Sequence, residues 1–324
     1  MEVYPALSKA IEGFILWKSA CGLSQNTIND YQNYLNLFAR WSDDPDINLI
    51  STKTIESFFN YLQHEHKVHR GGFATEKSLA PKTISNVWIT FSVFWKWVVE
   101  NYRIPSPFII PKIRAKVLPI MPLSSEEVDL LLKACEYAEE RIPSNRQRYK
   151  AKRPTFKRDR AIILTLLDTG IRASELCGIS MENVDLTIGR LFVTGKGNKS
   201  RYVYVGKRSK QAIWAYVSQR FPRGKPPVDE PLFVETTGLN RLRRNGLLHL
   251  LKSLAGRYGI NDVHPHKFRH TFAVEFLRNG GNVFTLQQLL GHSSLDMVRR
   301  YVALAETDLE HEHQKASPAD RWHL

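Results

Sequence analysis

The chain has 324 residues, of which 46 are Lys or Arg and 32 are Asp or Glu, so its formal net charge at pH 7 is +14. Its length leaves room for two domains, and the basic excess favours a polyanionic partner such as nucleic acid. The three cysteines form no CxxC pair, no basic-apolar leader opens the chain, and no run of about 18 apolar residues exists. We therefore expect no disulfide framework, no membrane span and a cytoplasmic location.

Residues 1–103 are predicted to be helical, as a small four-helix domain. Apolar residues recur at helical spacing, and Ser24 and Ser51 stand where N-caps of the second and third helices are expected. The fourth helix should follow Pro81. Its tryptophans, Trp88, Trp95 and Trp97, are expected to pack in the core, with contact to a DNA backbone as the alternative.

Residues 104–122 form the predicted linker. The stretch 103–122 holds five prolines and four basic residues, and proline keeps the residue before it out of the helical region. An extended basic tether suits two domains that close around a duplex. An ordinary interdomain linker explains the same composition.

A second domain is predicted over 123–324, mainly helical with a small antiparallel β-sheet. Ser124 and Glu127 have the spacing of a capping box at its first helix. The segment 141–160 has nine basic residues and one acidic residue, so we expect it to be too polar for the core. It is interpreted as a mobile or DNA-facing insertion, with a solvated loop as the alternative.

The following segments alternate between helical and β patterns. The sequence predicts a buried helix from residue 161, a break at Gly170 and a second helix starting near Ala173. Two β-rich runs flank GKGNKS at 195–200, which predicts a hairpin. Further helices are expected over 207–221, 242–258, 266–279 and 283–290, and from Ser294 onward.

Arginine and histidine residues in the second domain suggest an anion site. Arg172 lies in an apolar segment and needs an anionic partner, either Glu175 in a structural pair or a bound phosphate, in which case Glu175 would orient Arg172. His266 and Arg269 are spaced i, i+3, so they share one helix face. Pro265 suits the first helical position, which places His266 near a helix N-terminus where an anion is stabilised.

Three other residues become candidate site residues only in combination with these arginines and histidines. Lys196 in the hairpin is either a solvated turn residue or a proton donor, and His292 after Gly291 is either structural or part of the site. Tyr301 alone would be a packed tyrosine. A phenol with a pKa of about 10 becomes a useful nucleophile when cations stabilise both the oxyanion and the phosphate it attacks.

Bound cofactors are not expected. HxHxxxH at 264–270 is loosely compatible with zinc, but basic residues rather than a carboxylate stand beside it. GKGNKS lacks the GxxxxGK[ST] frame and does not open a helix, which argues against a nucleotide site.

The motifs TGIRASEL, GKGNKSRYVYV, HPHKFRHTFAVEFLRNGG and LQQLLGHSSLDMVRRYV resemble those of the tyrosine recombinase (phage integrase) family. The resemblance spans nearly all of the second domain, and residues 1–103 resemble the family's core-binding domain. It implies a site-specific recombinase acting on double-stranded DNA in integration or excision of a mobile element or in chromosome dimer resolution, without metal or nucleotide. The basic segment 141–160 is longer than the family's usual spacer.

The resemblance also implies roles for individual residues. Tyr301 would attack a DNA phosphate and form a 3′-phosphotyrosyl link. Arg172 and Arg269 would stabilise the charge on the non-bridging oxygens. His266 would accept the phenol proton and Lys196 would protonate the leaving 5′-oxygen. The two remaining positions are the phosphate-binding His292 and the supporting acidic residue Glu175.

The C-terminal tail is expected to dock on a neighbouring protomer and give a homotetramer on two DNA sites; a frayed terminus is the alternative. The tail includes a possible helix over 307–314 and ends near Trp322. Three other functions stay open: a catalytically idle DNA-binding regulator, a type IB topoisomerase-like enzyme and a metal-dependent nuclease.

Overall fold

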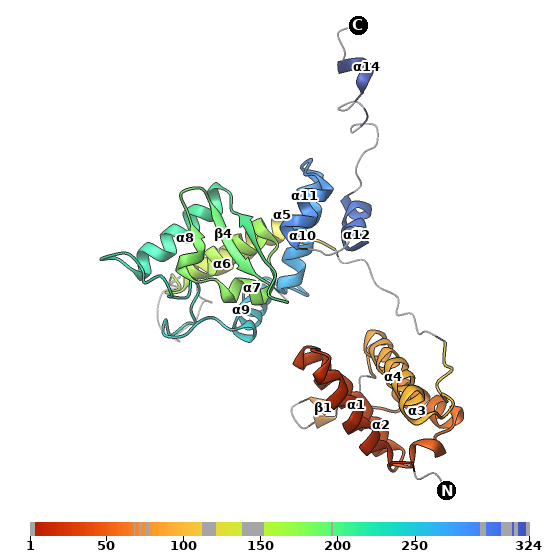
Figure 1. Cartoon of the computed structure of the whole chain (residues 1–324). Coiled ribbons are helices and arrows are strands. Elements are labelled where there is room, and N and C mark those ends of the chain that lie inside the picture. The colour runs from red at the N-terminus through yellow and green to blue at the C-terminus, as the bar shows by residue number, and fades with distance from the viewer. Residues whose placement is uncertain are drawn as a thin grey trace. The chain divides into compact units, whose positions relative to one another are not determined.

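The chain divides into two compact units, residues 1–118 and 119–324, each with its own core (Figure 1). The computed structural model describes residues 4–67, 69–70, 73–74, 78–111, 121–137, 152–195, 197–291, 296–305, 313 and 317–321.

Four α-helices build the described part of the first unit, as the sequence predicts. In chain order its elements are α1 (Leu7–Ala20), α2 (Gln25–Trp41), the 3-10 helix η1 (Ile47–Leu49), α3 (Thr52–His64), β1 (His69–Arg70), β2 (Phe73–Ala74) and α4 (Pro81–Tyr102). The side chain of Ser24 accepts a hydrogen bond from the backbone N–H of Thr27, and Ser51 does the same for Thr54. Both predicted caps are therefore confirmed. The short antiparallel β1–β2 pair was not expected.

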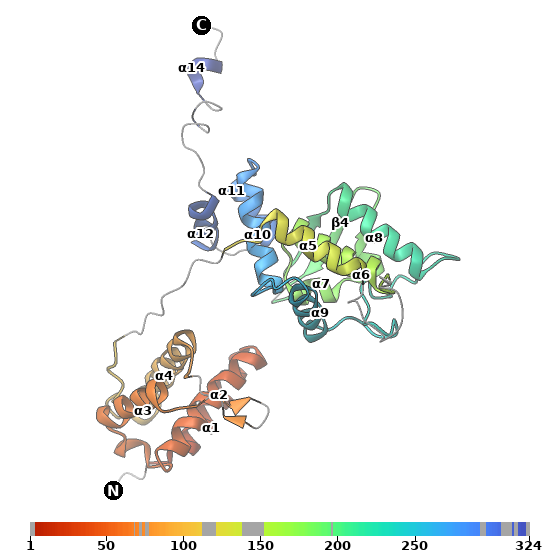
Figure 2. The ribbon, with the colours of Figure 1, turned by 180° about the vertical axis from the view of Figure 1, so that it is seen from behind.

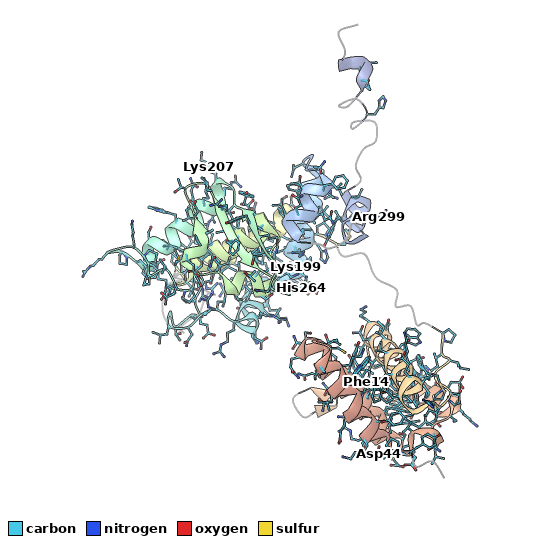
Figure 3. All side chains as sticks on the ribbon, in the orientation of Figure 1. Phe14, Asp44, Lys199, Lys207, His264 and Arg299 are labelled. Atoms are coloured by element: carbon cyan, nitrogen blue, oxygen red, sulfur yellow. The ribbon has the colours of Figure 1, made fainter. Side chains whose placement is uncertain are left out.

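Aromatic side chains fill the core of this unit. Phe14, labelled in Figure 3, is fully buried and meets Phe94 edge-on at a centroid distance of 5.3 Å. Trp95 and Trp97 are also buried, which confirms their predicted packing role. The half-buried Trp88 donates its indole N–H to the carbonyl of Ile110 at 2.9 Å. Part of the extended stretch after α4 therefore packs on this unit.

The second unit combines helices with a three-stranded antiparallel sheet (Figures 1 and 2). Its elements are α5 (Ser125–Glu136), α6 (Phe156–Thr169), α7 (Ala173–Gly178), η2 (Met181–Asn183), β3 (Val184–Asp185), β4 (Arg190–Thr194), β5 (Ser200–Tyr204), α8 (Lys207–Arg220), α9 (Arg244–Gly256), α10 (Pro265–Arg278), α11 (Val283–Leu290), α12 (Asp296–Ala305) and α14 (Pro318–Arg321). The strand order is β3-β4-β5, and Phe192 pairs with Tyr202 in the predicted hairpin. The fold is mainly α with a small antiparallel sheet, as predicted.

Two apolar clusters stabilise the second unit. The larger includes buried residues of α5, α6, α8 and α9 and the inward side chains Leu191, Val193 and Val203 of the sheet. The smaller joins α10, α11 and α12, which lie together in both views (Figures 1 and 2). The predicted capping box at Ser124 and Glu127 opens α5. None of the helices in the described parts of the chain is long and apolar enough to cross a membrane.

The prediction for the basic segment 141–160 is wrong over its last part. Helix α6 begins at Phe156, and the carboxylate of the fully buried Asp159 is bound by Arg158 at 2.7 Å and Arg153 at 3.0 Å. The basic composition hid this ion-pair network, because charged side chains can be buried once their charges are paired. Residues 141–151 of the segment lie outside the described residues.

Candidate active site

The junction between α6 and α7 places the first arginine. Helix α6 ends at Thr169, and its C-cap residue Gly170 has a φ of 58°, in the left-handed region that favours glycine. Arg172 follows as the N-cap residue of α7, and its backbone N–H donates to Glu175 Oε2 at 2.8 Å. The predicted break at Gly170 and the start at Ala173 are thus confirmed. Together they present the Arg172 side chain at the beginning of a helix.

Glu175 is the buried anchor of the site. Its side chain is 0% exposed, and its Oε1 accepts hydrogen bonds at 2.9 Å from Nη1 of both Arg172 and Arg201. Arg201 Nη2 donates to the other carboxylate oxygen, also at 2.9 Å. Burial alone would raise the pKa of Glu175, but the bonds from Arg201 and Arg172 hold it at about 2. Glu175 is therefore ionised at neutral pH.

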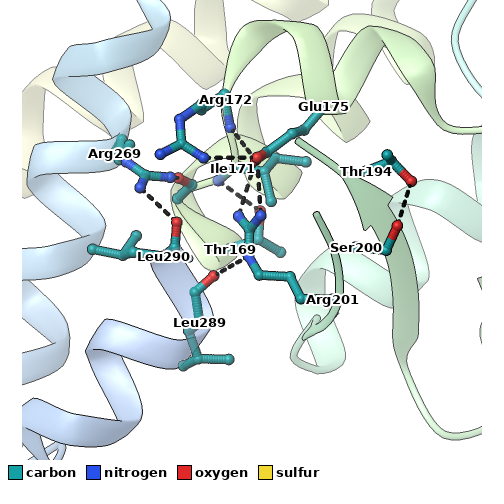
Figure 4. A network of polar contacts seen from close by, with 11 residues as sticks. Thr169, Ile171, Arg172, Glu175, Thr194, Ser200, Arg201, Arg269, Leu289 and Leu290 are labelled. Atoms are coloured by element: carbon teal, nitrogen blue, oxygen red, sulfur yellow. Dashed lines mark hydrogen bonds and ion pairs between the residues drawn. The ribbon is translucent and has the colours of Figure 1, made fainter. Parts of the chain in front are cut away.

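Arg201 was missed by sequence reasoning. It lies on β5 between the exposed residues Ser200 and Tyr202, so its side chain points inward, where it is 14% exposed. Strand alternation within SRYVY could have shown that this arginine faces the core, but not which carboxylate would meet it. Figure 4 shows Arg172 and Arg201 converging on Glu175.

Arg269 comes from α10 and is almost fully buried. Its Nη1 donates to the carbonyl of Gly170 at 2.9 Å, and its Nη2 donates to the carbonyl of Leu290 at 2.7 Å (Figure 4). Burial, and next the charge of Arg172, lower the pKa of Arg269 to about 10. The guanidinium stays charged at neutral pH and belongs to the same electrostatic cluster as Arg172.

His266 lies in the first turn of α10. Pro265 occupies the first helical position, as predicted, and the His264 side chain caps the helix by accepting from the backbone N–H of Lys267 at 3.2 Å. His266 is exposed, yet partial desolvation and then the charges of Arg269 and His264 lower its pKa. It is therefore predominantly neutral at pH 7, which is the form able to accept a proton.

The β4–β5 hairpin lies against the side chain of Glu175. A Cβ on Gly195 would meet Glu175 Oε1 at 2.7 Å, so only glycine allows this approach. Gly195 also donates to the carbonyl of Lys199 at 2.9 Å, and the hydroxyls of Thr194 and Ser200 are 2.9 Å apart. Lys196, which follows Gly195, lies outside the described residues.

Tyr301 lies on α12 within the smaller cluster and is 6% exposed. Its ring packs beside that of His270, and the negative charge of its ionised form raises the pKa of Arg269. Helices α10 and α12 are in contact, so the tyrosine and the arginine cluster belong to one region. His292 and the predicted cap Ser294 lie outside the described residues. Gly291, just before His292, is the C-cap residue of α11 and has a φ of 63°.

The described residues can bind and stabilise an anion. Arg172 and Arg201 bind one carboxylate and Arg269 lies nearby on two backbone carbonyls, which leaves an excess of positive charge beside the neutral His266 and a phenol. Planar guanidinium groups bind phosphate oxygens well, and a developing negative charge is stabilised by such fixed cations. Within the described residues, no three His, Cys, Asp or Glu side chains come together as a metal site.

The chain resembles known proteins over both units. Residues 122–308 match the phage integrase family, and residues 11–103 match the phage integrase N-terminal SAM-like domain. Tyrosine recombinase XerC of Staphylococcus epidermidis is 29% identical over 318 residues, which cover 96% of this chain and 98% of that protein. Tyrosine recombinase XerC of Leptospira interrogans is 28% identical over 301 residues, covering 92% and 89%.

Solved structures share the fold. The Tn1549 transposon integrase in complex with a circular intermediate DNA has a TM-score of 0.71 at 18% identity, covering 96% of this chain and 99% of that chain. The XerH site-specific recombinase bound to a palindromic difH substrate has a TM-score of 0.65 at 18% identity, covering 97% and 84%.

Proposed function

The chain belongs to the phage integrase family and is a tyrosine-type site-specific recombinase, and we propose that Tyr301 is the nucleophile with which it cleaves and rejoins DNA. The observation that carries this proposal is the arginine cluster: Arg172 and Arg201 bind Glu175, and Arg269 lies nearby on α10, the helix that contacts the helix bearing Tyr301. A tyrosine needs such cations to attack a phosphate at neutral pH.

Arg172 and Arg269 are proposed to bind the non-bridging oxygens of the scissile phosphate. Glu175 orients Arg172 by accepting hydrogen bonds from both the backbone N–H and the guanidinium group of Arg172. Arg269 is fixed by two carbonyls, so little reorganisation is needed when charge develops on the phosphate. Both arginines remain positively charged throughout the reaction.

Proton transfer is assigned to His266 and Lys196, and phosphate binding to His292. His266, neutral at pH 7, accepts the phenol proton as the Tyr301 oxygen bonds to phosphorus. The bond from phosphorus to the 5′-oxygen breaks, and Lys196 donates a proton so that a free 5′-hydroxyl leaves. His292 donates a hydrogen bond to a phosphate oxygen. The 3′-phosphotyrosyl link retains the energy of the broken ester, so a 5′-hydroxyl of a second strand can reverse the reaction without ATP or a metal.

Double-stranded DNA is the proposed partner of both domains. Residues 1–103 act as the core-binding domain, 104–122 as the linker and 123–324 as the catalytic domain with its tail. The net charge of +14 comes entirely from residues 104–324, because residues 1–103 hold ten basic and ten acidic residues, and it supports DNA binding by the linker and the second domain. A cytoplasmic location is proposed because the DNA substrate is found there. The biological process is integration or excision of a mobile element, or chromosome dimer resolution.

Assembly on DNA is proposed to be a homotetramer that joins two sites. The tail after Tyr301 would dock on the neighbouring protomer, so that four active sites act in one complex. The predicted tail helix over 307–314 falls largely outside the described residues, as does Trp322.

The decisive experiment is a search for a covalent intermediate. The protein is incubated, in excess chelator, with nicked DNA fragments from around its own gene, beside Tyr301→Phe. We expect a protein–DNA adduct on a denaturing gel with the wild type alone. An adduct with both proteins would move the nucleophile away from Tyr301.

The same assay separates the alternative functions. Salt-dependent binding without any adduct would indicate a DNA-binding regulator. Relaxation of supercoils without strand exchange between two sites would indicate a type IB topoisomerase-like enzyme. Loss of cleavage in chelator would indicate a metal-dependent nuclease.

A further inference from the structure

Arg201 is bonded to two parts of the site at once. Its Nη1 and Nη2 donate to the two oxygens of Glu175, and its Nε donates to the carbonyl of Leu289 at 2.7 Å (Figure 4). The guanidinium group therefore links β5, the N-terminus of α7 and the last turn of α11. The side chain is mostly buried, so these bonds are shielded from competing water.

The end of α11 is held by two arginines. The consecutive carbonyls of Leu289 and Leu290 accept hydrogen bonds from Arg201 and Arg269, each at 2.7 Å. Cations at a helix C-terminus interact favourably with its dipole. A Cβ on Gly291 would meet Arg201 at 3.2–3.3 Å, so the chain passes directly over this side chain. The residue that follows is His292.

The carboxylate of Glu175 is saturated by the two arginines. Arg201 donates one hydrogen bond to each carboxylate oxygen, and Arg172 also donates one to each, through its backbone N–H and its Nη1. A carboxylate can accept about four hydrogen bonds. Arg172 is thus oriented through one guanidinium nitrogen, while its side chain remains 31% exposed.

We propose that Arg201 is a positioning residue that neutralises Glu175, so that Arg172 is oriented without losing its charge to the carboxylate. This inference rests on the proposed function of Arg172 as a phosphate ligand. With Arg201 present, the three groups carry one net positive charge. Without it, Glu175 and Arg172 would form a neutral, bidentate pair, and the phosphate would lose a cation. Arg201 also fixes the end of α11 that leads to His292.

The test compares Arg201→Gln with the double variant Arg201→Gln/Glu175→Gln. For the single variant we expect adduct formation on nicked DNA to slow about 100-fold, as for loss of one charge-stabilising donor. Removing the carboxylate charge frees Arg172 again, so the double variant should recover about 10-fold of this loss. Arg201→Lys keeps the charge but makes fewer bonds, and its loss should be smaller than that of Arg201→Gln.

Arg190→Gln is the matched control. Arg190 lies on the neighbouring strand β4, where its guanidinium stacks on Tyr202 at 4.5 Å instead of contacting Glu175. It should retain the wild-type rate. Circular dichroism melting of each variant shows whether it is folded at the assay temperature. A purely structural role of Arg201 predicts that the double variant is as slow as the single variant or slower, which would overturn the proposal.

A second readout is independent of cleavage. The slope of log K against log salt for duplex binding should become shallower by about 0.9 in Arg201→Gln, because one phosphate contact is lost. The double variant should restore the slope. If the wild type forms no adduct but the slopes behave in this way, the proposed reaction fails and the role of Arg201 stands. Equal slopes in Arg201→Gln and Arg190→Gln would reject that role.

Discussion

The imidazole ring of His270 lies beside the phenol ring of Tyr301, with ring centroids 5.4 Å apart and ring planes tilted by 49°. Burial, and next the charges of His266, His264 and Arg269, lower the pKa of His270 to about 4. His270 is therefore neutral at pH 7 and packs on the proposed nucleophile as an uncharged ring. Protonation would bring another positive charge into a region that already holds Arg269.

This relationship predicts a pH-dependent stability. His270 has a folded-state pKa of about 4, below the unfolded value of about 6.5, so the unfolded chain binds more protons between these values. The contribution is fully present above about pH 6.5 and is lost as the pH falls to about 4. We expect His270→Gln to lose less thermal stability than the wild type between pH 7 and pH 4.5.

The control for that experiment is His249→Gln, at an exposed position on α9. It should retain the wild-type decrease in melting temperature over the same pH interval. An equal decrease in His270→Gln and the wild type would contradict the assignment of this titration to His270.

Local signals in the sequence predicted most of the elements but not the contacts between them. Ser24, Ser51 and Ser124 cap helices through neighbours three residues away, which a sequence pattern can show. The pair of Glu175 and Arg201 joins residues 26 positions apart, and only the folded sheet brings them together. The motifs nominated Arg172 and Arg269 together, whereas Arg201 had no signal except strand alternation.

The charge pattern of the segment 141–160 led to a wrong prediction for its last part, because the sequence does not show which charges pair in the fold. A segment with nine basic residues and one acidic residue is predicted to be exposed to solvent. The one acidic residue, Asp159, nevertheless forms ion pairs with Arg153 and Arg158 at the start of α6. Composition counts charges without showing which of them are paired. The first part of the segment, 141–151, keeps its sequence-based interpretation as a prediction.

Asp159→Ala is predicted to destabilise the second unit severely. The change removes the anion that binds the buried Arg158 and the half-buried Arg153, and an unpaired buried charge costs about 3–5 kcal/mol. Urea unfolding measures the loss. Asp129→Ala on α5 is a control, because no ion pair holds that aspartate among the described residues, and it should unfold near the wild-type midpoint. A loss below about 1 kcal/mol for Asp159→Ala would contradict the paired-network interpretation.

Gly170→Ala should distort the junction that carries Arg172. The residue has a φ of 58°, and an added Cβ would lie 2.4 Å from Phe272. Strain and overpacking together should cost about 1–3 kcal/mol and reduce adduct formation. Gly256→Ala, at the end of α9, has nothing within 4 Å of the added methyl group and serves as the control. Equal melting temperatures for the two variants would show that the junction tolerates a side chain.

DNA binding should weaken steeply with salt, because each neutralised phosphate contributes a slope of about −0.9 in log K against log salt. Arg172→Ala is expected to make this slope shallower by about one contact. Arg220→Ala should not, because Arg220 lies in the last turn of α8, outside the cluster around Glu175, and is bound to Glu230 and to the carbonyl of Pro231. Fluorescence anisotropy on a short duplex at several salt concentrations measures all three proteins. A salt-independent affinity of the wild type would contradict binding through phosphates.

The proposed tetramer predicts that the tail acts in assembly and not in binding to a single site. Deleting residues 306–324 leaves Arg172, Glu175, Arg269 and Tyr301 in place, so affinity for one DNA site should stay within about 3-fold of the wild type. The paired-site complex should be lost, because docking of the tail in each protomer would add to the affinity of every interface in the ring. Gel shifts with one and with two sites measure the two steps separately. Unchanged pairing of sites by the shortened chain would refute the role of the tail and leave the proposed cleavage chemistry untouched.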